Sequence, residues 1–119
     1  MEFQGVRFLR SDCFIEMPSD KENVLTYLYG GTSETIVIAV KEREEAMLLP
    51  IRLCNRCEEL YFTTAVCGSL KGDMYITKNE TVIYQLELPY KILEITITQM
   101  RRFITDELYV IDFLDSLTY

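Results

Sequence analysis

The fold is decided by residues 73–117, which read DMYITKNETVIYQLELPYKILEITITQMRRFITDELYVIDFLDSL. In the first half of this stretch, apolar side chains recur at every second residue, which is the period of a strand with one face on a core. These residues are Met74, Ile76, Val82, Tyr84, Leu86 and Leu88. The pattern predicts a β-hairpin whose turn comprises residues 78–80.

After Pro89 the apolar residues recur at steps of three and four, which is the period of a helix with one buried stripe. The stripe comprises Ile97, Met100, Ile104, Leu108, Ile111 and Leu114. It predicts a closing helix that begins between Glu94 and Thr98 and runs nearly to residue 119. Because the hairpin and the helix each have one apolar face, we expect them to cover each other.

Three segments before this stretch are predicted to be extended. They are residues 1–17, 24–29 and 35–41, which alternate apolar side chains or are rich in β-branched and aromatic residues. Gly30 and Gly31 predict a tight turn between the last two segments, because paired glycines reach positive φ angles at no steric cost. Both faces of residues 35–41 are apolar, which is typical of a central strand covered on both sides.

A helix is expected after the third segment, because Pro50 suits a first helical turn, where its missing amide proton costs nothing. Its end lies between Leu60 and Gly68, and the sequence leaves that boundary open because residues 62–66 are also strand-like. The resulting order is three strands, a helix, two strands and a helix. This order predicts a single α+β domain over residues 1–119, an antiparallel sheet in β-β-β-α-β-β-α order with the helices packed on one face.

The composition favours an acidic cytoplasmic protein that binds another protein. Twelve basic and 19 acidic residues give a formal net charge of −7, which repels phosphate backbones and argues against nucleic acid as a general partner. An acidic surface serves solubility, and it also docks on basic proteins. No apolar run approaches the ~18 residues that a membrane span requires, and the first residues lack the pattern of a signal peptide. We therefore expect no membrane partner.

No residue pattern identifies a reaction. The chain contains no histidine, the commonest general base and the usual partner of a Ser or Cys nucleophile. Neither a G-x-x-x-x-G-K nor a G-x-G-x-x-G motif is present, so the glycines do not predict a phosphate-binding loop. We therefore expect no enzymatic activity, no catalytic residues and no cofactor.

The four cysteines leave a different class of function open. Cys54 and Cys57 form a C-x-x-C pair, and together with Cys13 and Cys67 they match the number of thiolates in a structural zinc site. Cys13 and Cys67 occur singly, however, and all four cysteines have apolar neighbours, where buried free thiols are common. We therefore predict no metal site, with a cysteine-based zinc or redox protein as the alternative.

The predicted partner-binding residues are Tyr84, Tyr109, Asp112 and Phe113. Tyrosine suits interfaces because its apolar ring carries a polar tip. Phe103, Tyr109, Val110 and Phe113 make the closing helix apolar around more than one stripe, which predicts a homodimer or another protein along this helix. Asp112 lies beside the apolar stripe, where it either faces water or meets a partner.

The order of elements over residues 24–117 resembles the YbjN-like and type III secretion chaperone-like domains. The resemblance rests on a helix that opens near Pro50, a hairpin of residues 72–76 and 82–89, and a closing helix that carries Ile111 and Asp112. It implies a small, acidic, non-enzymatic protein that binds another polypeptide, often as a homodimer. The alternative among binding proteins is a small acidic immunity or anti-defence inhibitor that blocks a basic toxin or nuclease.

Overall fold

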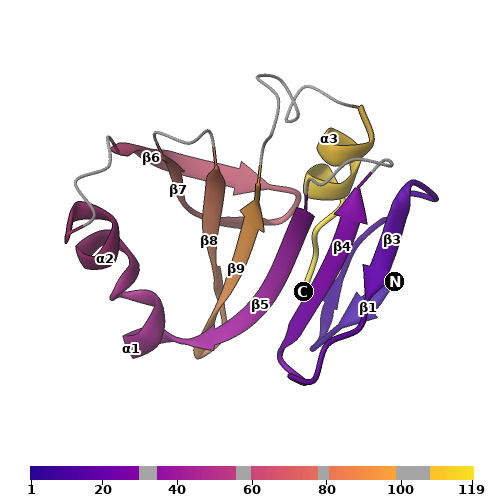
Figure 1. Ribbon diagram of the computed structural model, residues 1–119, viewed down its shortest axis with the longest axis horizontal. Helices are drawn as coiled ribbons and strands as arrows, with labels where there is room; N and C mark the ends of the chain where they lie inside the picture. Colours follow the sequence, from indigo (N-terminus) through magenta and orange to yellow (C-terminus); the bar gives the residue numbers. More distant parts are fainter. Residues whose placement is uncertain (30–34, 56–59, 78–80, 99–107) are drawn as a thin grey trace.

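The structure, a computed structural model, describes residues 1–29, 35–55, 60–77, 81–98 and 108–119 (Figure 1). The described residues form nine strands and three helices. In chain order these are β1 (Glu2–Phe3), β2 (Val6–Arg7), β3 (Phe14–Met17), β4 (Val24–Tyr29), β5 (Thr35–Glu42), α1 (Arg43–Ala46), α2 (Leu49–Asn55), β6 (Leu60–Cys67), β7 (Leu70–Thr77), β8 (Val82–Leu88), β9 (Lys91–Ile97) and α3 (Leu108–Asp115).

Seven strands form one antiparallel sheet in the order β3-β4-β5-β9-β8-β7-β6, and β1 pairs with β2 in a separate ribbon. The sheet consists of two meanders, β3-β4-β5 and β6-β7-β8-β9. They join where β9 pairs with β5, with Ile36 opposite Ile97. The antiparallel α+β character is therefore confirmed, but the predicted order of elements is wrong, because the sheet contains strands that the sequence analysis assigned to helices.

The predicted hairpin is confirmed as β7 and β8, and its alternation determines which face is buried. Tyr84, Leu86 and Leu88 are all buried on one face, together with Leu93 and Ile95 of the neighbouring strand β9. The predicted turn at residues 78–80 and the predicted turn at Gly30 and Gly31 lie outside the described residues. The central position of β5 is also confirmed, since it pairs with β4 and β9.

The main core lies on this face and is covered by α3 and the N-terminal strands (Figure 1). Its centre is a group of aromatic rings: Phe8 packs edge-on against Phe113 at 5.2 Å between centroids, and Phe14 lies 5.6 Å from Tyr27. Edge-to-face and tilted ring pairs at such distances are favourable beyond the area that they bury. The same buried cluster contains Val110 and Phe113 of α3 together with Tyr84 and Leu86 of β8. The closing helix and the hairpin therefore share one core, as expected from residues 73–117.

The opposite face of the sheet carries α1 and α2, so the prediction that the helices pack on one face is wrong. Leu49 and Leu53 of α2 pack on Tyr75 of β7 and Ile83 of β8. Tyr75 and Ile83 are opposite in register and alternate with the residues that face the main core. Because both faces of the central strands carry apolar side chains, the sheet needs a helix on each face.

The closing helix is shorter than predicted because its expected first turn is a strand. Residues 91–97 form β9, in which Leu93, Ile95 and Ile97 are buried on the main-core face. The β-branched run of residues 95–98 fits this pleated, central position better than a helix. Residues 99–107, which include Met100 and Ile104 of the predicted stripe, lie outside the described residues. Among the side chains of α3 that the structure describes, Val110, Phe113 and Leu114 are buried, and Leu117 after the helix is buried as well.

The first predicted helix is confirmed only in its first two turns. Pro50 lies in the first turn of α2, as expected, and α2 ends at Asn55. The strand-like residues 62–66, which left the boundary open, belong to β6. The short helix α1 follows β5 directly, and the sequence analysis did not anticipate it.

The N-terminal ribbon of β1 and β2 is joined to the segment that follows α3. Arg7 and Thr118 exchange two backbone hydrogen bonds of 2.7 and 2.9 Å. The β6–β7 turn closes against the same region, where the Ser69 N–H donates to the Leu117 carbonyl at 2.9 Å. Gly68 has a φ of +62°, and a Cβ there would lie 2.2 Å from the Leu117 oxygen. Only glycine fits this turn, because both the φ angle and the close backbone approach exclude a side chain.

Candidate functional site

The predicted partner-binding residues do not form one surface. Phe113 is fully buried and Tyr84 is 8% exposed, so both side chains belong to the core. Asp112 is exposed at the rim of a hollow of about 230 Å³ that Arg10 and Asp12 also line. This position agrees with the interpretation that Asp112 faces water. The side chain of Tyr109 lies outside the description.

The described cysteines differ in exposure and provide no metal centre. Cys13 is exposed before β3, whereas Cys67 is buried at the end of β6. Burial, and then the nearby Asp115 carboxylate, raises the pKa of the Cys67 thiol to about 11. Within the described part of the chain no three His, Cys, Asp or Glu side chains gather as metal ligands. Cys57 and the Cys54 side chain lie outside that part, so the zinc and redox alternative stays a prediction.

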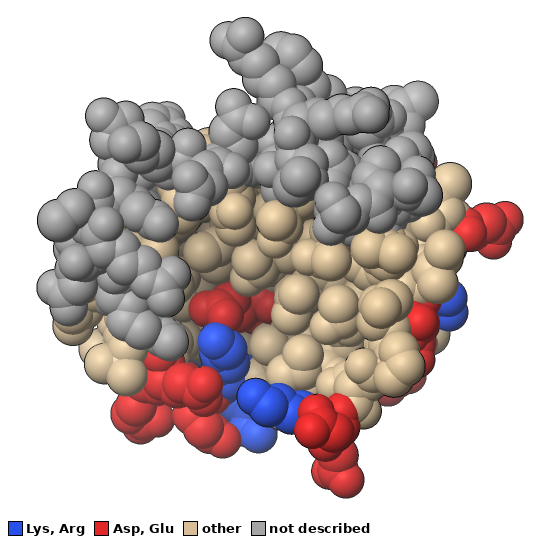
Figure 2. Space-filling model, in the orientation of Figure 1, with Lys and Arg blue, Asp and Glu red and all other residues tan. Residues whose placement is uncertain are grey.

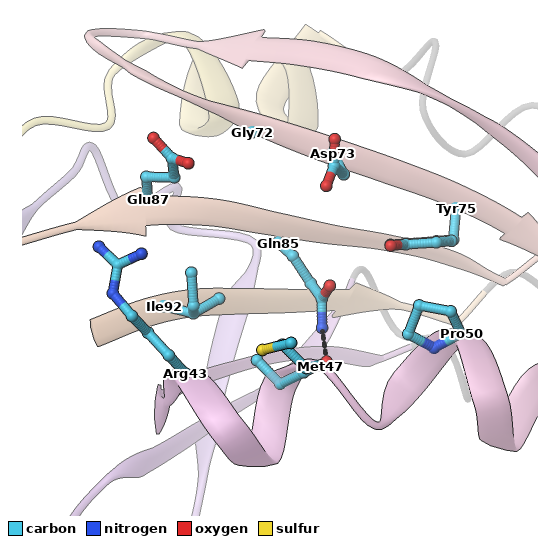
Figure 3. A pocket seen from close by; sticks show the side chains of 10 residues that line it. Arg43, Met47, Pro50, Gly72, Asp73, Tyr75, Gln85, Glu87 and Ile92 are labelled. Atoms are coloured by element: carbon cyan, nitrogen blue, oxygen red, sulfur yellow. Dashed lines mark hydrogen bonds between the residues drawn. The ribbon is translucent and has the colours of Figure 1, made fainter. Parts of the chain in front are cut away.

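A cavity lies on the other face of the sheet, between α1–α2 and strands β7 and β8 (Figure 3). Its volume is about 420 Å³, within the range of about 300–1,000 Å³ that is usual for ligand pockets. The cavity combines charged, polar and apolar side chains from five elements. The lining residues are Arg43, Ala46, Met47, Pro50, Gly72, Asp73, Tyr75, Gln85, Glu87 and Ile92.

The floor of the cavity is held by a buried polar network. Gln85 and Glu94 are opposite each other on the central strands β8 and β9, and each is less than a tenth exposed. The Gln85 Nε2 donates to the Ala46 carbonyl at 2.8 Å, which ties α1 to the sheet (Figure 3). The same nitrogen donates to Glu94 Oε1 at 3.1 Å. The ammonium of Lys41 lies 2.6 Å from Glu94 Oε2. The buried carboxylate is thus paired and hydrogen-bonded, as burial of a charge requires.

The strand side of the cavity carries two carboxylates. Asp73 comes from β7 and Glu87 from β8 (Figure 3). Neither forms an ion pair with a described lysine or arginine. Arg43 lies at one end of the cavity, where its guanidinium donates to the Leu88 carbonyl at 3.2 Å. The charged lining therefore has one more negative than positive group.

The helix side of the cavity is apolar and open to solvent. Met47 is 72% exposed, and the adjacent Leu48 and Ile51 are each more than half exposed. These residues surround the α1–α2 corner, at the lower left of Figure 1. Figure 2 shows acidic side chains gathered over this corner, beside a hollow in which basic side chains also lie, and Glu44 and Glu45 are the exposed acidic residues of α1.

Tyr75 places a neutral hydroxyl at the same cavity. Burial of the ring, and then the nearby Asp73 carboxylate, raises the pKa of Tyr75, so its hydroxyl stays protonated at neutral pH. Gly72 lies beside Asp73, and a Cβ there would lie 2.0 Å from the Gln85 carbonyl oxygen. The absence of a side chain at Gly72 therefore lets β7 approach β8 closely at the cavity.

Sequence reasoning missed this cavity because its residues come from segments assigned to different structures. One signal was present: Gln85 and Glu94 are polar residues inside two otherwise apolar runs, and buried polar groups require partners. That signal is readable only once residues 91–97 are recognised as a strand that pairs with residues 82–88.

Comparison with protein-family models, with curated proteins and with solved structures finds no match for this chain. In the described residues, no helix has the length and apolar character to cross a membrane.

Proposed function

We propose that this chain is a non-enzymatic, cytoplasmic protein-binding module that holds an extended segment of another polypeptide in the cavity between α1–α2 and β7–β8. The observation that carries the proposal is the pairing of two carboxylates, Asp73 and Glu87, with an exposed apolar wall around Met47. The kinship with YbjN-like and secretion chaperone-like domains stays a prediction.

The preferred segment follows from the charges of the lining. A lysine or arginine of the partner would meet Asp73 and Glu87, which have no described basic partner of their own. An apolar residue next to it in the partner would cover Met47 and Ile92. Charge complementarity of this kind raises association rates and selects among partners, while the apolar contact supplies most of the affinity.

The rigid floor supports binding rather than catalysis. Glu94, the most buried carboxylate near the cavity, pairs with Lys41 through one oxygen and accepts a hydrogen bond from Gln85 through the other, so both of its oxygens already have partners within the chain. Arg43 is likewise anchored to the Leu88 carbonyl. A fixed polar floor between an apolar wall and an acidic wall is suited to recognising a side chain in a defined orientation.

The test is an array of extended peptides with a central lysine or arginine between apolar residues, each with a counterpart in which the basic residue is glutamate. We expect the basic peptides alone to bind. The double variant Asp73→Asn with Glu87→Gln should weaken the best peptide by about 30-fold, because losing two partly exposed charge contacts costs about 2 kcal/mol.

The matched control is Asp20→Asn with Glu22→Gln, which makes the same charge change at exposed residues before β4. It should leave the affinity within about twofold. Nuclear magnetic resonance should place the peptide at the cavity, through shifts of the Gln85 side-chain amide and the Met47 methyl. Equal binding of the glutamate peptides, or an equal loss in the control variant, would contradict the proposal.

A further inference from the structure

The strand β6 is an edge of the large sheet, and within the described part of the chain it lacks the charged residues, prolines and bulges that usually protect an edge from pairing with another chain. Its eight residues pair with β7 on one side, and no described strand lies on the other. It contains no charged residue and no proline, and its register with β7 is continuous from Leu60 to Cys67 without a bulge. Natural proteins blunt exposed edges with these very devices, so a long edge without them is suited to strand pairing.

The opposite edge of the sheet is shorter, carries a charge and ends at a proline. The edge strand β3 has four residues, includes Glu16 and is followed by Pro18. A short, charged strand that ends at a proline is a poor template for another strand. The contrast between the two edges singles out β6.

The backbone groups that point to the free edge of β6 can be assigned. The Thr77 N–H of β7 donates to the carbonyl of Thr81, which precedes β8. In an antiparallel strand the backbone groups of successive residues point alternately to the two neighbouring strands. The backbone groups of Asp73 therefore also point to β8, whereas those of Met74 point to β6. Met74 is opposite Thr63 in register, and therefore Thr63 bonds to β7. The next residue along, Thr64, directs its N–H and C=O away from the sheet.

By the same alternation Phe62 and Val66 also direct their backbone groups to the free edge. Their side chains are 54% and 73% exposed, on the face that carries the cavity. The Phe62 ring packs against Tyr75 at 5.2 Å between centroids, which holds the ring in place beside the edge. The edge therefore offers unpaired backbone groups together with an ordered apolar side chain.

We propose that β6 pairs antiparallel with β6 of a second copy of this chain, about a two-fold axis that passes midway between the Thr64 residues of the two copies. An axis perpendicular to the sheet keeps each face on the same side, so paired residues come from the same set of alternating positions. In this register Thr64 lies opposite Thr64 of the other copy, and Phe62 lies opposite Val66. Threonine pairs and aromatic pairs with β-branched residues are among the favourable cross-strand combinations.

A second copy fits this edge better than an unrelated strand for two reasons. The register is self-complementary, since one axis satisfies the backbone groups of Phe62, Thr64 and Val66 in both copies with about six hydrogen bonds. The chain carries a net charge of −7, so two copies repel each other wherever their surfaces are acidic. The uncharged β6 is a place where they can approach without that repulsion.

The test measures the mass of the full chain in solution by light scattering, over a dilution series. The wild type should have twice the chain mass of 14.0 kDa. Thr64→Pro should raise the dimer dissociation constant by about 30-fold or more, because each copy loses an N–H that crosses the axis but makes no bond to β7. Circular dichroism checks that the variant remains folded.

A second variant, Val66→Lys, keeps the test decisive if the proline disturbs the strand. It places a charge opposite Phe62 of the other copy and should also give the monomer. The control, Ile15→Lys, adds the same charge at an exposed residue of the other edge strand and should remain a dimer. A monomeric wild type overturns the proposal. A wild-type dimer whose dissociation constant is unchanged in both β6 variants also overturns it, because the interface would then lie elsewhere, for example on the closing helix.

Discussion

The substitution Lys41→Met tests the polar floor of the cavity. Lys41 is the ion-pair partner of Glu94, at 2.6 Å, and the two side chains are 20% and 9% exposed. Removing one member of a buried pair costs about 3–5 kcal/mol, because the other charge stays buried without compensation. Since Lys41 retains some contact with water, we expect the lower end, about 3 kcal/mol of the free energy of unfolding.

Urea unfolding followed by circular dichroism measures this loss. With a slope of about 2 kcal/mol per molar urea, the midpoint should fall by about 1.5 M. Lys91→Met is the matched control, because it removes a lysine whose partner Glu42 is 3.5 Å away and more than half exposed. That surface pair should contribute less than about 0.5 kcal/mol.

The double variant Lys41→Met with Glu94→Gln separates the pair from the individual side chains. A glutamine at position 94 still accepts from Gln85 and carries no charge, so the double variant should recover to within about 1 kcal/mol of the wild type. Equal losses for Lys41→Met and Lys91→Met would refute the reasoning. A double variant as unstable as the sum of the two single variants would refute it as well.

Two further predictions concern stability. Gly68→Ala should lower the free energy of unfolding by about 3 kcal/mol, because it combines a positive φ with a Cβ against the Leu117 backbone. Gly5→Ala meets only the exposed Tyr119 ring and should lower it by about 1 kcal/mol. Thermal unfolding of both variants measures the difference, and equal losses would contradict the prediction. Burial, and then the Cys67 thiolate, raises the pKa of Tyr84 to about 12. Above pH 10 the unfolded chain therefore loses this proton while the folded chain keeps it, so the free energy of unfolding falls as the pH rises. By pH 11 the wild type should lose about 1.4 kcal/mol relative to Tyr84→Phe. Urea unfolding of both proteins at pH 8 and pH 11 measures this loss. An unchanged difference between the two proteins would contradict this prediction.

Local alternation predicted the hairpin and the central strand correctly, because both depend on which residues of a short segment are apolar. The strand from Lys91 to Ile97 was not predicted, and the helix was expected to begin between Glu94 and Thr98, because Ile97 also fits a helical spacing with residues further along the chain. The competing signal, Leu93, Ile95 and Ile97 at every second position, becomes decisive only when β5 and β8 lie on either side. Pairing with β5 and β8 thus determined the structure of residues 91–97, and the helical spacing applies only to residues further along the chain.

The candidate site was less predictable than the fold. Phe113 and Tyr84 were expected at an interface because aromatic side chains are common there, but both side chains are buried in the core of this chain. The cavity depends on α1, on Gly72 and on the pairing of Gln85 with Glu94, which bring together residues far apart in the chain. No local sequence pattern predicts that these residues lie together, because their proximity follows from the strand order.

The strand order also determines how the chain must assemble. β9 is the last strand of the large sheet to be synthesised, yet it occupies a central place in it, between β5 and β8. Until β9 emerges, β5 can pair with β4 alone, and a strand with apolar side chains on both faces exposes an open edge. Non-local pairing of this kind folds slowly and leaves the nascent chain prone to aggregation. The pairing of β9 with β5 is therefore the folding step at which a newly made chain gains most from protection by a chaperone.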